Sequence, residues 1–169
     1  LLRREPLSEE LDRAVIALGR DEAPLVRLIA AKLATSFIVF GRDAEGLHAT
    51  VLGCLTDPDP NVAAACALEA PNTLDKRVID RMVMCLSDGR GLDPRAPRPM
   101  RFGEGRVSDI LTRHLSWIFY SEQVARWRAS PAEADPKYVP MSADRIREWW
   151  KENREAFGFE TPAPQWRCV

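Results

Sequence analysis

The residues whose types and spacing first suggest chemistry are Asp57, Asp59 and Asn61, which alternate in an Asp-Pro-Asp-Pro-Asn stretch. Oxygen-bearing side chains at every second position open many calcium-binding loops. The rest of the stretch does not fit, because Val62 stands where such a loop needs glycine and Leu68 where it needs a bidentate glutamate. We therefore expect no calcium and no other metal here.

Other catalytic patterns are also lacking. His48 and His114 are isolated on helical segments, and neither has a glutamate or histidine three or four residues further on. The stretch Gly89-Arg90-Gly91 does not lead into a helix, as a phosphate-binding loop would. No serine nucleophile elbow is present. The sequence therefore predicts a protein that is not an enzyme and that holds no cofactor.

The four cysteines are Cys54, Cys66, Cys85 and Cys168, and no two of them form a CxxC pair. Three lie in apolar helical patterns, which favours buried thiols in a reducing compartment. A Cys54–Cys66 or Cys66–Cys85 bridge in an exported protein stays open. The chain starts at Leu1 without a signal peptide, as a processed product or a piece of a longer protein would. The cytoplasm is favoured, and export with processing remains the alternative.

Composition and charge narrow the classes of partner. The chain has 169 residues, 46% hydrophobic and 29% charged, with a net charge of −1. This size and composition predict one globular domain. A nucleic-acid or anionic-membrane binder would be more basic, so we expect another protein as the partner. The most apolar run, residues 33–40, is much shorter than the roughly 20 residues of a membrane span.

Two groups of residues are candidates for binding that partner. Residues 88–105 contain four glycines and three prolines and read as a loop. This loop is either a basic docking segment for an acidic partner or a solvated insertion. Its arginines are Arg90, Arg95, Arg98 and Arg101. The large aromatic residues of the last third either cap the fold or form a binding patch, for which Trp117, Tyr120 and Trp127 are the candidates.

The elements that must position these residues are helices. Apolar periodicity and capping signals predict helices over residues 8–19, 22–40, 44–55, 61–70, 73–87, 107–120 (with a further turn or two toward 128) and 142–157. The expected N-caps are Ser8, Asp43, Asp59, Thr73 and Ser142. Leu25, Ile29, Leu33 and Phe37 are expected on the inward face of their helix. No segment alternates as a strand does, so the fold class is all-α.

The corners between these helices repeat. Leu18, Leu55 and Leu86 each precede a similar turn, at spacings of 37 and 31 residues along the chain. The segments after the first two turns carry Ala30-Ala31 and Ala64-Ala65, which allow close helix packing. Paired helices at such a period are typical of an α-solenoid.

On these features, the Asp-Pro-Asp-Pro-Asn-Val corner and the alanine-rich helix after it, residues 10–157 resemble short bacterial proteins of the HEAT-repeat family. The Trp149-Trp150 helix also resembles the tryptophan-rich helix that closes several of them. Two departures stand out: Ala63 replaces the basic residue present as Arg27, and the 88–105 loop is atypical.

The resemblance implies a right-handed α-solenoid of stacked antiparallel helix pairs. Its repeats are expected at residues 8–41, 43–71 and 73–120, the last with the 88–105 insertion. A linker, capping helix and tail follow over 121–169. The implied function is non-catalytic protein binding or scaffolding, including a role as a subunit of a larger assembly. The alternative is an enzyme-associated HEAT protein of the lyase or chaperone type that holds a prosthetic group.

One helix gives a sharper expectation. Residues 61–70 contain only two polar side chains, Asn61 and Glu69. A helix that is apolar on nearly every side is normally buried on nearly every side. We expect the 88–105 loop, the 158–169 tail or a helix of another protein to cover it. Its alanines, Ala63, Ala64 and Ala67, are therefore candidates for contact with a partner.

Overall fold

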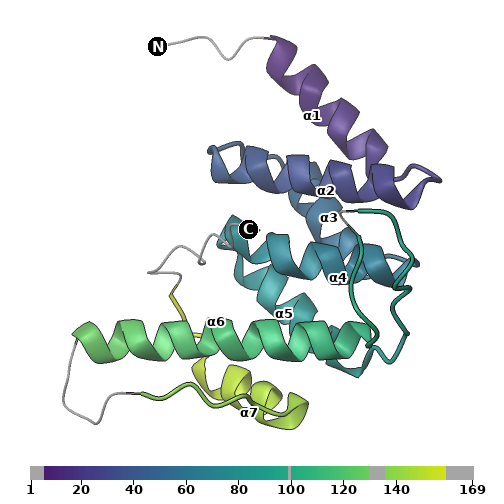
Figure 1. Ribbon diagram of the computed structural model, residues 1–169. Helices are drawn as coiled ribbons and strands as arrows, with labels where there is room; N and C mark the ends of the chain where they lie inside the picture. Colours follow the sequence, from purple (N-terminus) through teal and green to yellow (C-terminus); the bar gives the residue numbers. More distant parts are fainter. Residues whose placement is uncertain (1–5, 99, 130–135, 159–169) are drawn as a thin grey trace.

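The computed structural model describes residues 6–98, 100–129 and 136–158, and this part of the chain is all-helical (Figure 1). The α-helices are α1 Pro6–Leu18, α2 Pro24–Val39, α3 Glu45–Cys54, α4 Pro60–Glu69, α5 Lys76–Met84, α6 Val107–Ala129 and α7 Ala143–Asn153. Two short 3-10 helices, η1 Ala70–Thr73 and η2 Cys85–Ser87, flank α5. The expected all-α class is confirmed.

Alternate helices contact one another in two series. Helices α1, α3, α5 and α7 form one series, in which each contacts the next, and α2, α4 and α6 form the other. Consecutive helices also pack together, as α1 does with α2 and α5 with α6. In Figure 1 the helices follow one another from α1 at the top of the view to α7 at the bottom. Helix α4 is therefore enclosed between α2 and α6.

Capping explains where several helices begin. The Asp59 carboxylate accepts hydrogen bonds from the backbone N–H groups of Asn61 and Val62, at 2.8 and 3.3 Å, and Pro60 opens α4. The Ser142 hydroxyl accepts the N–H of Arg145 at 3.2 Å and caps α7. Both predicted caps are confirmed.

Three other predicted caps are wrong. Ser8 lies inside α1, which already begins at Pro6. Thr73 ends η1 instead, Leu74 takes a left-handed conformation (φ 57°), and Asp75 caps α5 by accepting the N–H of Arg77. The residue at the N-cap of α3 is Ala44, which makes no side-chain cap. Asp43 binds the side chain of His48 instead. At α3 and α5 the residue that the sequence indicated lies one or two positions before the true N-cap. Asp43 precedes Ala44, and Thr73 precedes Asp75.

Helix α2 buries only part of the face expected to point inward, since Leu25 and Phe37 are half-buried against the core but the two residues of that face between them are exposed. Ile29 and Leu33 are 46% and 39% exposed, whereas Leu28, Ala31 and Ala34 are fully or almost fully buried. The small alanines let α2 lie directly against its neighbours, and this close approach outweighs the larger apolar side chains. The expectation that Ile29 and Leu33 point inward is therefore wrong.

Helix length and hydropathy also bear on membranes. None of the described helices is long and apolar enough to cross a bilayer.

Candidate functional site

The second corner, residues 55–59 between α3 and α4, is organised by Asp57. Its carboxylate is 5% exposed and accepts Nε and Nη2 of Arg27 at 2.7 and 2.8 Å. The same carboxylate accepts the backbone N–H of Asp59 at 2.8 Å. The hydrogen bond to Asp57 raises the pKa of Arg27. The two aspartates that suggested calcium are thus occupied, one by an arginine and the other by the start of α4.

Arg27 also reaches the first corner, residues 19–23 between α1 and α2. Its Nη1 donates to the main-chain carbonyls of Asp21 and Glu22, both at 2.9 Å. The Asp21 carboxylate accepts the N–H of Ala23 at 2.8 Å, just as Asp57 accepts the N–H two residues ahead. One guanidinium therefore ties the two corners together.

Arg90 repeats this arrangement at the third corner, which begins at Asp88. Its Nε and Nη2 bind the Asp88 carboxylate at 2.9 and 2.6 Å, and its Nη1 donates to the carbonyls of Asp57 and Pro58 at 2.7 and 2.9 Å. Hydrogen bonding from Arg90 lowers the pKa of Asp88. Arg90 was predicted to bind a partner, but its side chain is committed to contacts within the chain.

The 88–105 loop is anchored by Asn61, at the start of α4. Its side-chain Nδ2 donates to the carbonyls of Asp93 and Met100 at 3.0 and 2.8 Å, and its Oδ1 accepts the N–H of Asp93 at 2.9 Å. Leu92, Ala96 and Met100 of the loop are buried in the hydrophobic core. The loop is therefore a packed part of the structure and not a solvated insertion. Whether it is also a docking segment depends on its exposed arginines.

Helix α4 is covered by the chain itself. Ala63, Ala64 and Ala67 are at most 1% exposed, between α2, α6 and the anchored loop. The expectation that α4 is buried is confirmed. The prediction that these alanines contact a partner is wrong, because no surface of them remains accessible.

The other loop arginines differ from Arg90. Arg101 is exposed and donates from Nε to the carbonyl of Ala96 at 3.2 Å. Arg95 and Arg98 are exposed, and within the described residues neither side chain forms an ion pair. These two guanidiniums are the part of the loop that remains available to an acidic group.

The aromatic residues separate into two clusters. Phe119 of α6 stacks on Trp149 and Trp150 of α7, with ring centroids 4.1 and 5.7 Å apart, and all three are buried. Trp150 Nε1 also donates to Asp80 of α5 at 2.9 Å. The hydrogen bond from Arg154 is the largest cause that lowers the pKa of Asp80. This cluster closes the α7 end, as a cap does.

The second aromatic cluster lies partly in solvent. Trp117 and Tyr120 of α6 meet Tyr138, and the three ring centroids are 5.5–5.6 Å apart. Tyr138 is 39% exposed. Trp127 lies in α6, but its side chain, like Trp166, is outside the described residues. The two candidates that can be placed, Trp117 and Tyr120, are half-buried beside a third ring that the sequence did not single out.

Both histidines are buried, in unlike surroundings. His48 lies between Asp75 and Asp43, with ring nitrogens 3.0 and 3.1 Å from their carboxylates. Burial would raise the pKa of Asp75, but hydrogen bonds from Arg77 lower it. His114 is 7% exposed, and burial lowers its pKa to about 4. Within the described chain, no three histidine, cysteine or acidic side chains gather as metal ligands do.

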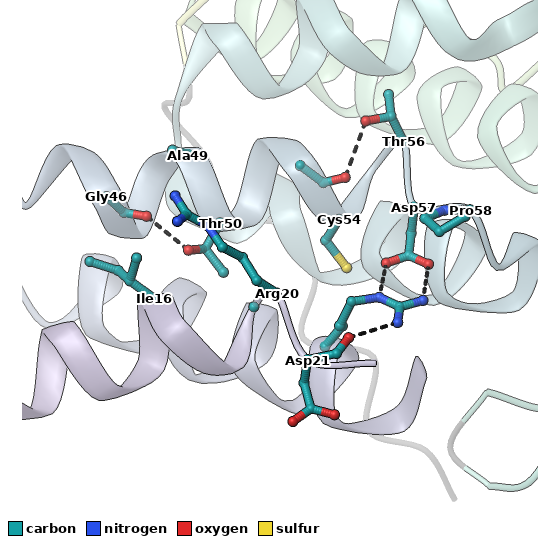
Figure 2. A pocket seen from close by; sticks show the side chains of 13 residues that line it. Ile16, Arg20, Asp21, Gly46, Ala49, Thr50, Cys54, Thr56, Asp57 and Pro58 are labelled. Atoms are coloured by element: carbon teal, nitrogen blue, oxygen red, sulfur yellow. Dashed lines mark hydrogen bonds and ion pairs between the residues drawn. The ribbon is translucent and has the colours of Figure 1, made fainter. Parts of the chain in front are cut away.

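A groove of about 460 Å³ lies where the first two corners meet α3 (Figure 2). We call it the corner groove. Added Cβ atoms at Gly46 and Gly19 would collide with Ile16 and Thr50, so these glycines allow α1 to approach α3. The lining of the corner groove includes Ile16, Arg20, Thr50, Cys54, Asp57 and Pro58. The groove thus combines charged groups, hydroxyls and one thiol.

The exposed side of α2 forms an apolar surface that we call the α2 face. It consists of Ile29, Leu33 and Phe40, which are 46%, 39% and 84% exposed. Ile29 and Leu33, four residues apart, lie on one side of α2, and Phe40 directly follows the last residue of the helix, Val39. Beside this face, Lys32 of α2 binds Glu69 of α4 at 3.2 Å. The sequence pattern assigned Ile29 and Leu33 to the core and made no prediction for the side chain of Phe40.

These features define a helical protein in which arginine and aspartate side chains tie helix corners together and in which α2 carries several exposed apolar side chains. No protein-family model, curated protein or solved structure matches the chain. The function is therefore argued from the structure.

Proposed function

We propose that the chain is a HEAT-like α-solenoid that acts as a non-catalytic protein-binding or scaffolding module. The repeated corner supports the solenoid: Asp21, Asp57 and Asp88 each accept the N–H two residues ahead, at 2.8, 2.8 and 3.1 Å. The arginine clamps between successive corners, and the serial contacts of alternate helices, support it as well. Such arrays present continuous helical surfaces for binding.

The observation that carries the binding function is the α2 face. Phe40, at 84% exposure, is the most exposed large apolar side chain in the described part of the chain, and Leu33 and Ile29 lie along the same helix side. Clustered exposed apolar side chains on one element mark interaction sites more often than scattered ones do. Arg95, Arg98, Trp117 and Tyr120 are secondary contacts in this proposal.

Co-purification with matched variants tests this function. The tagged chain, expressed in its native cells, is expected to retain one stoichiometric partner. The double variant Leu33→Ser/Phe40→Ser is expected to bind that partner about tenfold or more weakly and to retain correspondingly less of it. The reason is that each apolar anchor contributes on the order of 1 kcal/mol to binding.

The control is Met84→Ser, which removes another highly exposed apolar side chain (69%) from α5, in the other series of helices. Equal retention of the partner by all three proteins would refute the role of the α2 face. Loss in both variants would mean that general surface hydrophobicity, rather than a site, holds the partner.

The corner groove favours a second candidate, a lyase- or chaperone-type protein that holds a prosthetic group. Its volume, about 460 Å³, is within the range of ligand sites, and Cys54 supplies a thiol on its wall. Visible absorbance of the protein purified from its own cells, combined with native mass spectrometry, tests this. A protein that is colourless and has the mass of the bare chain would argue against it.

A further inference from the structure

We propose that Cys54 and Cys66 form a redox-active dithiol, which a small two-electron oxidant such as hydrogen peroxide reaches through the corner groove and converts to a disulfide. The site joins the end of α3 to the middle of α4. It is independent of the proposed binding function.

The two cysteines belong to the core where α3 packs on α4. Cys66 Sγ donates to the carbonyl of Val51 at 3.6 Å, and Val51 lies one turn before Cys54 on α3. Interaction with Cys54 is the largest cause that raises the pKa of the Cys66 thiol. Both cysteines are free, and they are 2% and 6% exposed. Two free thiols on packed helices, one of them bound to the carbonyl one turn before the other, are placed to form a disulfide.

Only one of the pair faces an open space. Cys54 lines the corner groove, and Figure 2 shows its sulfur on the side of the groove where Asp57 meets its arginine partner. Cys66 does not line the groove and is enclosed by α4's neighbours. We therefore assign Cys54 as the sulfur that meets the oxidant and Cys66 as the sulfur that resolves it.

The chemistry balances in two steps. The Cys54 sulfur, having lost its proton, attacks one peroxide oxygen. The S–O bond forms, the O–O bond breaks, and the leaving hydroxide takes up the proton as water. The Cys66 sulfur then attacks the sulfenic sulfur of Cys54. The S–S bond forms, the S–O bond breaks, and hydroxide leaves as water with the Cys66 proton. Two thiols are oxidised and one peroxide is reduced to two waters.

The order of the two steps follows from burial. Hydrogen bonding with Cys54 and burial raise the pKa of the Cys66 thiol well above its usual value. A protonated, enclosed thiol is a poor first nucleophile. Cys85 is the other candidate for pairing, because its sulfur lies 3.8 Å from the carbonyl of Leu55. It does not line the groove.

Peptide mapping of the full-length chain gives a direct test. Trypsin cuts after Arg42 and Lys76, with no lysine or arginine between, so Cys54 and Cys66 fall in one peptide and Cys85 in another. After treatment with hydrogen peroxide, the peptide 43–76 is expected to lose two hydrogens and to take up no alkylating agent. Reduction is expected to restore two alkylation sites. A cross-link between peptide 43–76 and the Cys85 peptide would overturn the proposal, as would two alkylatable thiols after oxidation.

Variants separate the two roles. In Cys66→Ala, the oxidised Cys54 is expected to stop at sulfenic acid and to be trapped by dimedone. In Cys54→Ser, oxidation of Cys66 is expected to slow by about tenfold or more, since it lacks access. Cys85→Ala, the control, is expected to form the disulfide as the native chain does. Because the native chain alone gives the mapping result, poor folding of a variant would not rescue a failed proposal.

Discussion

Two junctions between successive corners use the same hydrogen-bond pattern but take their arginine from different places. At the first junction Arg27 comes from α2, and at the second Arg90 comes from the 88–105 loop. In both, Nε and Nη2 bind the aspartate of the later corner, Asp57 or Asp88. In both, Nη1 donates to two main-chain carbonyls of the earlier corner.

The difference explains the departure seen at Ala63. Arg27 lies six residues after Asp21, and the residue six after Asp57 is Ala63, which is 1% exposed and has no charge to offer. Arg90 supplies the guanidinium that position 63 lacks. At both junctions an arginine therefore donates to two corner carbonyls. Arg27 does so from α2, and Arg90 does so from the 88–105 loop.

Arg27→Met is expected to have the largest effect of the changes at the two junctions. The side chains of Arg27 and Asp57 are only 14% and 5% exposed. Removing the arginine leaves a buried carboxylate without its counter-charge, which costs about 3 kcal/mol of unfolding free energy. Urea unfolding followed by circular dichroism measures this loss.

Two controls accompany that measurement. Arg20→Met removes an exposed guanidinium on the corner groove and is expected to stay within about 0.5 kcal/mol of the native chain. Arg27→Lys keeps the charge but loses the two-pronged geometry, and is expected to fall between the two. If Arg27→Met is no more damaging than Arg20→Met, the first junction does not stabilise the fold.

The comparison also shows what the sequence can predict. Proline, glycine and capping residues are local signals, so the all-α class and most helix bounds follow from them, including the Asp59 cap. Which face of α2 is buried is not a local property, because it depends on the side that meets α3 and α4. The alanine side is buried there, although Ile29 and Leu33 are more apolar. The carbonyls that Arg90 and Asn61 bind lie about 30 residues or more away in the chain, beyond any local pattern.

Asn61→Ala is expected to have the second largest effect, because it releases the loop that delivers Arg90. Asn61 is 1% exposed and makes three hydrogen bonds to the loop backbone at Asp93 and Met100. Leaving these groups without a partner is expected to cost about 2 kcal/mol. Trypsin cleavage after the loop arginines is expected to become faster, as limited proteolysis would show.

The matched control is Asn72→Ala, a half-buried asparagine in η1 whose side chain makes no hydrogen bond within the described residues. It is expected to change stability by less than about 0.5 kcal/mol. Cleavage of the loop at the native rate in Asn61→Ala would contradict the anchoring role.

Arg90→Met is expected to destabilise the chain by about 1 kcal/mol, less than Arg27→Met. The side chains of Arg90 and Asp88 are 39% and 16% exposed, so solvent screens the pair and can replace part of it. Arg98→Met, an exposed loop arginine, is the control with no expected change. A loss equal to that of Arg27→Met would erase the distinction between the two junctions.

Acid titration separates the ionic from the main-chain part of the second junction, and this is the smallest effect. Hydrogen bonding from Arg90 lowers the pKa of Asp88 in the folded chain below its ordinary value of 3.8. The unfolded chain therefore binds a proton first as the pH falls. The stabilisation is fully present above the unfolded pKa and is lost as the pH falls through the folded pKa.

The native chain and Arg90→Met should accordingly converge between about pH 5 and about pH 3, by less than about 1 kcal/mol. The hydrogen bonds from Nη1 to the carbonyls of Asp57 and Pro58 do not titrate, so the difference that remains at the acid end measures them alone. In a chain that carries Asp88→Asn, which cannot ionise at this position, adding Arg90→Met should cost this residual amount at every pH. If the gap between native chain and Arg90→Met is constant with pH, the main-chain bonds carry the whole junction, and the arginine serves the corner carbonyls rather than the aspartate.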